Sequence, residues 1–214
     1  VLFRSLIYLH FDMRTLAINI LIFMAATSFG QSPATFGELV HATDLGSLTP
    51  TPDRTIVGVQ YAAGSLWATG FDPDDYWQHK LYKFNEDGTV LLDVFSYGIE
   101  AAGWKDMAYD GDYLYVTDMD TIRQLDLGTG EKTGVTIPAP FYYNSGLAYN
   151  PLNDHFYVSG DGGSNIYEID REGTIISAID DYANHATVGL AVDTLSVGGP
   201  FLWTWSNESI GYNL

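Results

Sequence analysis

Four stretches of the chain follow the same order of residue types, and this repeat constrains the fold more than any other feature. Each copy begins with a small residue and a short apolar run, passes through a turn, and reaches a second run that contains aromatic residues and closes on Thr or Ser. The copies begin at Gly58, Asp106, Gly146 and Gly189, and their second runs close at Thr69, Thr117, Ser159 and Thr204. The starts are 48, 40 and 43 residues apart. A period in the forties made of strand-like segments is typical of the blades of a β-propeller.

Two further runs follow in each of the first three copies, so a complete repeat predicts four strands. The third and fourth runs are rich in β-branched and aromatic residues, and a turn that contains Gly separates them. The third strands are expected at 81–85, 122–126 and 166–170, and the fourth strands at 89–95, 132–137 and 174–179. Short strands of this composition favour an antiparallel meander. The sequence therefore predicts an all-β fold, a β-propeller of four-stranded antiparallel blades.

The repeats do not add up to a closed ring. The fourth copy holds little beyond its second strand, which ends near Trp205. Residues 36–57 precede the first copy and are expected to supply an outer strand to a final blade. A propeller has to join its last blade to its first or leave strand edges exposed. We therefore expect an incomplete ring of about three to four blades, truncated at the carboxy-terminal side. A complete four-bladed ring is the alternative.

The amino-terminal region has the pattern of a targeting segment. Met13 and Arg14 precede an apolar run from Leu16 to Met24, and small residues follow it up to Gly30. This order predicts a secretory signal peptide at residues 13–30. The alternative is a membrane anchor, but the apolar run is too short to cross about 30 Å of hydrocarbon at about 1.5 Å per residue.

Three regions are therefore expected. Residues 1–12 are interpreted as a non-native upstream extension, residues 13–30 as the signal peptide, and residues 36–214 as the β-propeller domain. The product is expected to be secreted or held at the cell surface, with no membrane insertion after the signal is cleaved.

Charge and the absence of one residue type exclude several functions. The chain has 27 Asp and Glu residues against 9 Lys and Arg residues, and a formal net charge of −18. Binding to nucleic acid depends on cationic side chains that neutralise phosphates, so we expect no nucleic-acid partner. The chain has no Cys. Disulfides, thiol catalysis and thiolate metal sites are therefore excluded together.

One blade resembles a known repeat family. The run Tyr113–Asp118, followed by Thr121–Glu131, is similar to the YVTN-type β-propeller repeat, in which a Tyr-Val-Thr strand precedes a strand that ends in Asp before a Thr-Gly turn. NHL-like and quinoprotein-like propellers share much of this pattern, which extends here over residues 58–205. The end of the predicted signal resembles exported proteins of Bacteroidetes-type bacteria. The resemblance implies a secreted bacterial propeller, here a fragment, of a kind that often precedes a sorting or adhesion region.

Ligand-binding residues are expected where the blades are connected. In a propeller, the crossover from one blade to the next lies on the same face as the loop between the second and third strands, and loops are free to vary. Aromatic rings beside polar groups suit a protein, peptide or glycan ligand. The predicted contact set is Tyr97, Trp104, Tyr142, Tyr143 and His185. The alternative for any of these aromatic residues is packing between blades.

An acidic loop offers a candidate Ca²⁺ site. Asp72, Asp74 and Asp75 place three carboxylates within four residues and offer oxygen ligands to Ca²⁺. Their spacing does not match an EF-hand loop, and Asp is also a common turn residue. No other cofactor is expected.

Three classes of function remain open. The first is an exported, non-enzymatic module for recognition or adhesion at the cell surface. The second is a propeller enzyme of the lyase or lactonase type with a divalent metal, and the third is a spacer that binds no ligand. The sequence has no Ser-His-Asp order, phosphate loop or zinc spacing. We therefore expect the binding module more than the enzyme.

Overall fold

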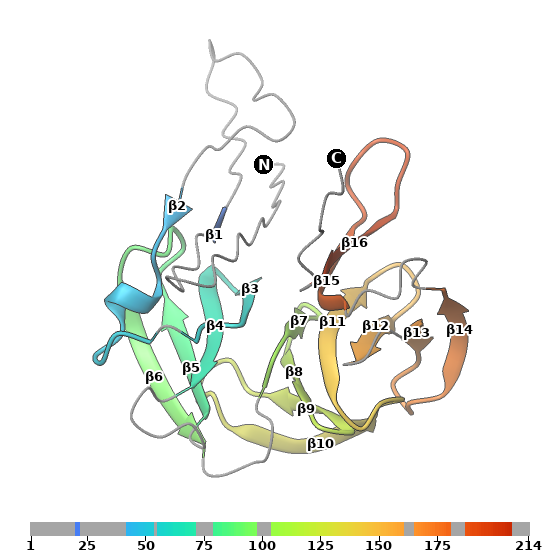
Figure 1. Cartoon of the computed structure of the whole chain (residues 1–214), viewed down its shortest axis with the longest axis horizontal. Coiled ribbons are helices and arrows are strands. Elements are labelled where there is room, and N and C mark those ends of the chain that lie inside the picture. Colours follow the sequence, from blue (N-terminus) through green and yellow to red (C-terminus); the bar gives the residue numbers. More distant parts are fainter. Residues whose placement is uncertain are drawn as a thin grey trace, which may run out of the picture.

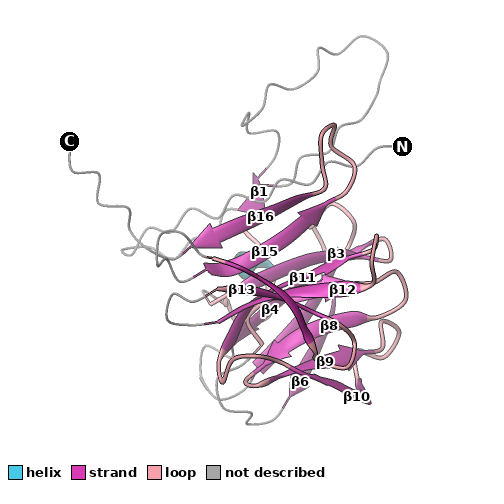
Figure 2. Ribbon diagram, turned by 90° about the vertical axis from the view of Figure 1, so that its right-hand side faces the viewer, coloured by secondary structure: helices cyan, strands magenta, loops and turns pink. Residues whose placement is uncertain are grey.

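The computed structural model describes residues 20–21, 42–53, 55–71, 79–97, 104–160, 165–180 and 187–206. In these ranges the regular structure consists of β-strands and one short 3-10 helix, η1 (Gly46–Leu48), as Figure 2 shows. None of the described residues belongs to a helix long and apolar enough to cross a membrane.

Three four-stranded sheets follow one another along the chain. Each is antiparallel, and its strands pair in the order in which they occur in the sequence. Blade 1 consists of β3 (Gly58–Ala62), β4 (Ser65–Phe71), β5 (His79–Phe84) and β6 (Leu91–Tyr97). Blade 2 consists of β7 (Met107–Tyr109), β8 (Leu114–Asp118), β9 (Thr121–Leu125) and β10 (Lys132–Pro138). Blade 3 consists of β11 (Asn144–Asn150), β12 (His155–Gly160), β13 (Ile166–Ile169) and β14 (Ile175–Ile179).

Two smaller sheets complete the described part. A fourth blade is represented by the pair β15 (Thr187–Asp193) and β16 (Phe201–Ser206). Near the amino terminus, β1 (Ile20–Leu21) pairs with β2 (Ala42–Thr43). The outer strand that residues 36–57 were expected to add to a final blade is not formed among the described strands, because β2 pairs with β1 and not with β16.

The blades fan out around a common centre. Figure 1 shows the first strands β3, β7, β11 and β15 at the middle and the last strands β6, β10 and β14 at the periphery. The inner strands contact one another in turn along the chain. Among the described strands the arc stays open, and the last sheet has two strands. The prediction of an incomplete β-propeller with four-stranded antiparallel blades is confirmed.

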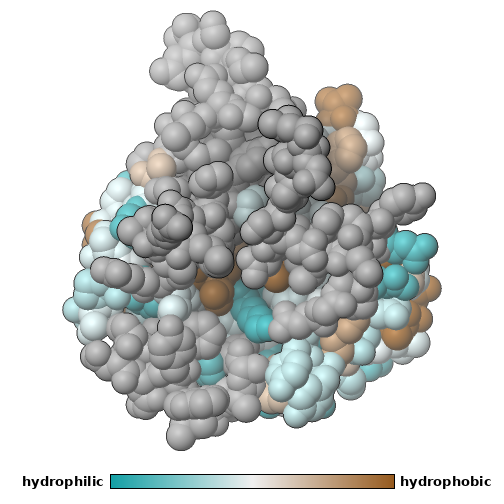
Figure 3. All heavy atoms as spheres, in the orientation of Figure 1, coloured by the Kyte–Doolittle hydropathy of each residue, from teal (hydrophilic) through white to brown (hydrophobic). Residues whose placement is uncertain are grey.

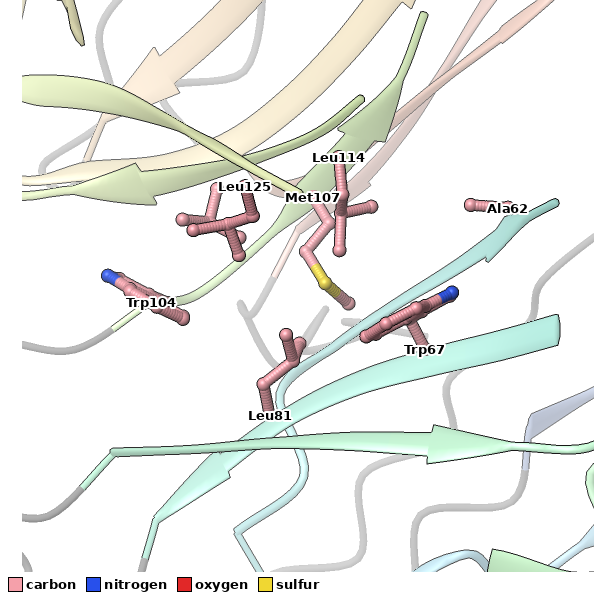
Figure 4. Packing of buried hydrophobic residues seen from close by; sticks show 8 residues of the cluster. Ala62, Trp67, Leu81, Trp104, Met107, Leu114 and Leu125 are labelled. Carbon is pink, nitrogen blue, oxygen red and sulfur yellow. The ribbon is translucent and has the colours of Figure 1, made fainter. Parts of the chain in front are cut away.

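Apolar side chains fill the spaces between neighbouring blades. Figure 4 shows Trp67 and Leu81 of blade 1 packed against Met107 and Leu114 of blade 2, with Trp104 from the crossover beside them. The second strand of each blade carries an aromatic residue at this place: Tyr115 packs into blade 3, and Tyr157 packs against the cluster that includes Leu190 of blade 4. This shared packing explains why an aromatic residue recurs in the repeat.

The recurrent hydroxyl residue joins blades by hydrogen bonds. Thr69 Oγ1 accepts a hydrogen bond from Gly58 N at 3.0 Å and donates to the carbonyl of Lys105, in the crossover to blade 2, at 3.3 Å. Ser159 Oγ donates to the carbonyl of Thr187, at the start of blade 4, at 2.7 Å. A buried hydroxyl at this position therefore satisfies backbone groups that no strand partner reaches.

The register corrects the sequence alignment of the fourth copy. Thr69 lies opposite Gly58 and Ser159 opposite Gly146, but the residue opposite Gly189 is Trp205, and Thr204 lies opposite Leu190. The fourth copy therefore has Trp205 where the others have Thr or Ser. The observed register differs from the sequence alignment by one residue, and such a shift moves every side chain to the other face of the strand. In the observed register Trp203 lies at the position that Trp67 has in blade 1.

Candidate functional site

The face expected to bind a ligand can be recognised by backbone contacts between blades 2 and 3. The amide of Ala139 donates to the carbonyl of Asp120 at 2.9 Å, and the amide of Asn144 donates to the carbonyl of Met119 at 3.0 Å. The crossover from β10 to β11 therefore lies against the turn between β8 and β9, as the topology of a propeller predicts. We call residues 139–144 the crossover segment.

Two tyrosines of the crossover segment face the solvent. Tyr142 is 64% exposed and Tyr143 is 44% exposed. Their ring centroids lie 4.7 Å apart and their planes meet at 81°, an edge-to-face arrangement. Such a pair is attractive in itself. The sequence predicted both residues as ligand contacts, and the structure brings them together on the expected face.

Buried contacts on both sides hold the crossover segment in place. Phe141 packs against Tyr167 of β13 with ring centroids 5.3 Å apart. It also covers Gly160, where an added Cβ would lie 2.4 Å from the Phe141 ring, so only Gly fits there. The side-chain amide nitrogen of Asn144 donates to the carbonyls of Met119 and Phe141. The two tyrosines therefore project from a backbone that is fixed by its neighbours.

One polar atom of the Asn144 side chain has no hydrogen-bond partner among the described residues. Its Nδ2 is occupied by two carbonyl acceptors, and this fixes which end of the amide is the oxygen. The Oδ1 atom is buried, and no hydrogen-bond donor reaches it in the part of the chain that the structure describes. A buried acceptor without a donor is uncommon and calls for a physical explanation.

Tyr97 and Trp104 have a different role from the one predicted. Trp104 is 2% exposed and packs against Tyr97, with ring centroids 4.2 Å apart and ring planes tilted by 45°. Lys132 lies over the Trp104 ring at 5.7 Å, and the Tyr97 hydroxyl donates to the carbonyl of Gly130. Burial, and next the charge of Glu131, raise the pKa of Tyr97 above its ordinary value.

This burial corrects the interpretation of Trp104 as a ligand contact. The crossover into β7 turns inward at Trp104, and its ring fills the space between blades 1 and 2. A side chain in that position presents no surface to a ligand. Half-buried Tyr97 packs against the same cluster, so we assign both residues to the core.

The remaining predicted site residues lie outside the described residues. His185 and the three carboxylates Asp72, Asp74 and Asp75 belong to segments that the structure does not describe. Within the ranges it does describe, His, Asp and Glu side chains do not gather in groups of three or more that would hold a metal ion. The predicted Ca²⁺ site therefore stays a prediction.

Sequence reasoning missed the role of Asp106, which lies where the inner strands meet. One carboxylate oxygen accepts the amides of Leu147 in β11 at 2.9 Å and Leu190 in β15 at 3.1 Å. The other oxygen accepts the amide of Met107 at 2.9 Å. Burial raises the pKa of Asp106 to about 7, although these three hydrogen bonds act in the opposite direction. The available signal was its position in the repeat, because the other copies have Gly there.

A second missed residue is Arg171, which lies at the end of the blades opposite to the crossover segment. It contacts Asp110 at 2.9 Å and Asp154 at 2.7 Å, and it donates to the hydroxyl of Tyr115 at 2.6 Å. Its guanidinium also lies over the rings of Tyr115, Tyr149 and Phe156. These contacts connect three turns of blades 2 and 3. These groups contact one another across the two blades, so we assign this cluster a role in holding blades 2 and 3 together.

Comparison with known proteins gives a likeness of fold. No model of a protein family matches the chain, and no curated protein is similar to it in sequence. Among solved structures, the chain is similar to a catalytically inactive variant of virginiamycin B lyase from Staphylococcus aureus with quinupristin, at 18% identity and a TM-score of 0.50. It is also similar to the luciferin-regenerating enzyme, at 16% identity and a TM-score of 0.51.

These likenesses cover most of this chain and about half of each other protein. The matched region is 74% of this chain and 51% of the lyase, and 69% of this chain and 52% of the luciferin-regenerating enzyme. At this identity the likeness concerns the fold, which agrees with the open arc of antiparallel blades. It assigns no activity to this chain.

Proposed function

We propose that the chain is a recognition module of an exported protein, and that it binds a protein, peptide or glycan through the crossover face. The observation that carries this proposal is the pair Tyr142 and Tyr143, exposed on a segment whose neighbours Phe141 and Asn144 are anchored. In this proposal the two rings would supply the contact surface for the ligand.

The chemistry of tyrosine supports this proposal. A tyrosine ring offers a large apolar face and a polar tip, and it loses little conformational entropy when it is fixed by a ligand. The backbone of the crossover segment is already held by hydrogen bonds to Met119 and Asp120. Little ordering of the site would therefore oppose binding. A protein, a peptide or a sugar ring would each find a stacking surface here.

Export is part of the same proposal. The pattern at residues 13–30 is that of a secretory signal, and the chain has no Cys and a net charge of −18. A high net charge favours the solubility of an extracellular protein. We place the module in the secreted fraction or at the cell surface.

The proposal is tested by binding measurements on the full chain. The unaltered protein is screened against immobilised glycans and peptides, and the double variant Tyr142→Ala with Tyr143→Ala is compared on every ligand retained. We expect affinity to fall at least about tenfold, as for aromatic residues at the centre of an interface. The matched control is Tyr113→Ala, because Tyr113 is an exposed tyrosine in the turn between β7 and β8, at the other end of the blades. Unchanged affinity in the double variant would remove the crossover face from the binding site.

A propeller enzyme of the lyase or lactonase type is the second candidate. Its support is the fold shared with virginiamycin B lyase and the luciferin-regenerating enzyme. In that case the protein would hold a divalent metal, with Asp72, Asp74 and Asp75 as the candidate ligands. Metal analysis together with turnover of a panel of cyclic esters separates the two functions, because bound metal that is lost together with activity favours the enzyme.

A further inference from the structure

We propose that the group recognised at the crossover face is an organic cation, the ammonium or guanidinium of a lysine or arginine side chain in a flexible peptide. This inference rests on the proposed function and narrows its ligand to one class. Two independent observations carry it: the geometry of the two rings and the charge of the chain.

The two rings form a corner that suits a cation. Since the planes of Tyr142 and Tyr143 meet at 81°, a group placed in the corner touches the face of one ring while lying beside the other. The face of an aromatic ring carries partial negative charge and attracts Lys and Arg side chains. The chain already uses this contact within its own fold, because Lys83 lies over the ring of Trp67 at 4.9 Å.

The charge of the protein favours a positive ligand. The net charge of −18 produces a negative potential that raises the local concentration of cations and their rate of association. Arg123, a basic side chain of blade 2, is paired with Asp118 at the end of β8, so the charges of these two side chains offset each other. The carboxylate of Asp120, in the turn that holds the crossover segment, is exposed. An anionic ligand would meet repulsion at the same place.

The experiment titrates the full chain with a fluorescein-labelled oligolysine peptide and with the same peptide carrying acetylated lysines. Acetylation removes the charge and keeps the length of the side chain. We expect the charged peptide to bind more tightly than the acetylated one, and the affinity to fall as salt is added. Since any anionic protein attracts oligolysine, this difference alone does not locate the site.

Variants that keep the charge locate it. In the double variant Tyr142→Leu with Tyr143→Leu the net charge stays the same and both rings are lost, so oligolysine affinity is expected to fall on the order of tenfold. The variant with both residues changed to Phe keeps the ring faces and is expected to retain most of the affinity. Tyr113→Leu is the matched control, because it loses an exposed tyrosine elsewhere and should bind as the unaltered chain does.

The outcomes separate this inference from the proposed function. If the Leu double variant binds oligolysine as well as the unaltered chain, the attraction is non-specific and the inference is overturned. If neutral peptides or glycans bind through Tyr142 and Tyr143 while oligolysine does not, the proposed function stands and the assignment to cations is overturned. If none of these ligands depends on the two tyrosines, both proposals fail.

Discussion

At the scale of single residues, Asp106 shows how much one substitution in a repeat can change. Its position is occupied by Gly58, Gly146 and Gly189 in the other copies. As a carboxylate it accepts amides from β11 and β15, the inner strands of two other blades. Those amides lie on strand edges and would otherwise be buried without an acceptor. A residue that departs from the repeat thus holds the centre of the arc together.

Asp106 also predicts a pH dependence of stability. Its pKa is raised from 3.8 to about 7 in the folded chain, because burial disfavours the charged form. The folded chain therefore binds this proton more tightly than the unfolded chain between about pH 4 and pH 7, and the contribution to the free energy of unfolding falls as the pH rises through that range. From pH 5 to pH 8 we expect a loss of about 3 kcal/mol from this group.

The measurement is urea unfolding at the two pH values. In Asp106→Asn the titrating group is absent, so the loss between pH 5 and pH 8 should shrink, while overall stability falls because the new amide nitrogen meets a backbone N–H. Asp120→Asn is the control, since Asp120 is exposed. Carboxylates with lowered pKa values, such as Asp154, stay ionised throughout this range and do not contribute. An unchanged pH dependence in Asp106→Asn would refute this account.

Residue identity alone did not distinguish buried from exposed aromatic residues. Trp104, Tyr142 and Tyr143 all lie in crossovers, and the sequence predicted the same role for each. The structure buries Trp104 between blades and exposes the tyrosines, because Phe141 takes the inward position in their crossover. Which aromatic residue of a crossover packs inward depends on the blade it meets, and that information lies forty residues away in the sequence.

At the scale of elements, the strands and their order could be predicted and the register of one strand could not. Alternating apolar and aromatic residues between Gly turns define a strand and its partner. The apolar run of β16 fits the repeat equally well in two registers that differ by one residue, and the pairing with β15 selects the one that places Trp205 opposite Gly189. The Arg171 cluster was not predictable either, because its partners come from three separate turns.

Arg171 gives the prediction that belongs to this scale. Hydrogen bonds from Arg171 lower the pKa of Asp154. At Asp110 burial raises the pKa, but the backbone amides of Tyr113 and Asp112, and next Arg171, lower it below its ordinary value. Arg171→Leu removes the cation and leaves Asp110 partly buried without it. We expect the free energy of unfolding to fall by about 2 kcal/mol, the range for charged hydrogen bonds.

Chemical denaturation of the full chain measures this change. Lys132→Leu is a suitable comparison, because it also removes a cation, and the cation–aromatic contact described for Lys132 is with one ring, that of Trp104. If Arg171→Leu were no less stable than that variant, the cluster would not hold blades 2 and 3 together.

At the scale of the whole molecule, the two ends of the arc differ. The outer face of blade 1 is covered by the segment that precedes it, in which Leu45 and Ile56 are buried. At the other end, the equivalent of buried Trp67 is Trp203, which is 38% exposed. Figure 3 shows hydrophobic residues gathered over the β15–β16 hairpin, at the upper right, where Leu195, Val197 and Phe201 are also exposed. The blade 1 end of the arc is therefore covered by its own chain, whereas the β15–β16 end exposes apolar side chains.

This difference predicts that the chain associates through the β15–β16 end. Exposed apolar patches and strand edges promote contact between molecules. Trp203→Thr should therefore lower self-association, measured by light scattering or sedimentation over a range of concentrations, without a loss of fold. Val90→Thr replaces another exposed apolar residue and should change nothing. Equal association in all three proteins would exclude this end as the contact surface.

The carboxylate shared by three inner strands also limits how this repeat protein can evolve. Blades built on one pattern are often thought to be interchangeable, so that an array can grow or shrink by whole repeats. Here the amides of Leu147 and Leu190 depend on Asp106, and a blade inserted between the second and third would move both strands out of its reach. The carboxylate thus makes the second, third and fourth blades depend on one another at the axis, and an added repeat there would have to replace these hydrogen bonds.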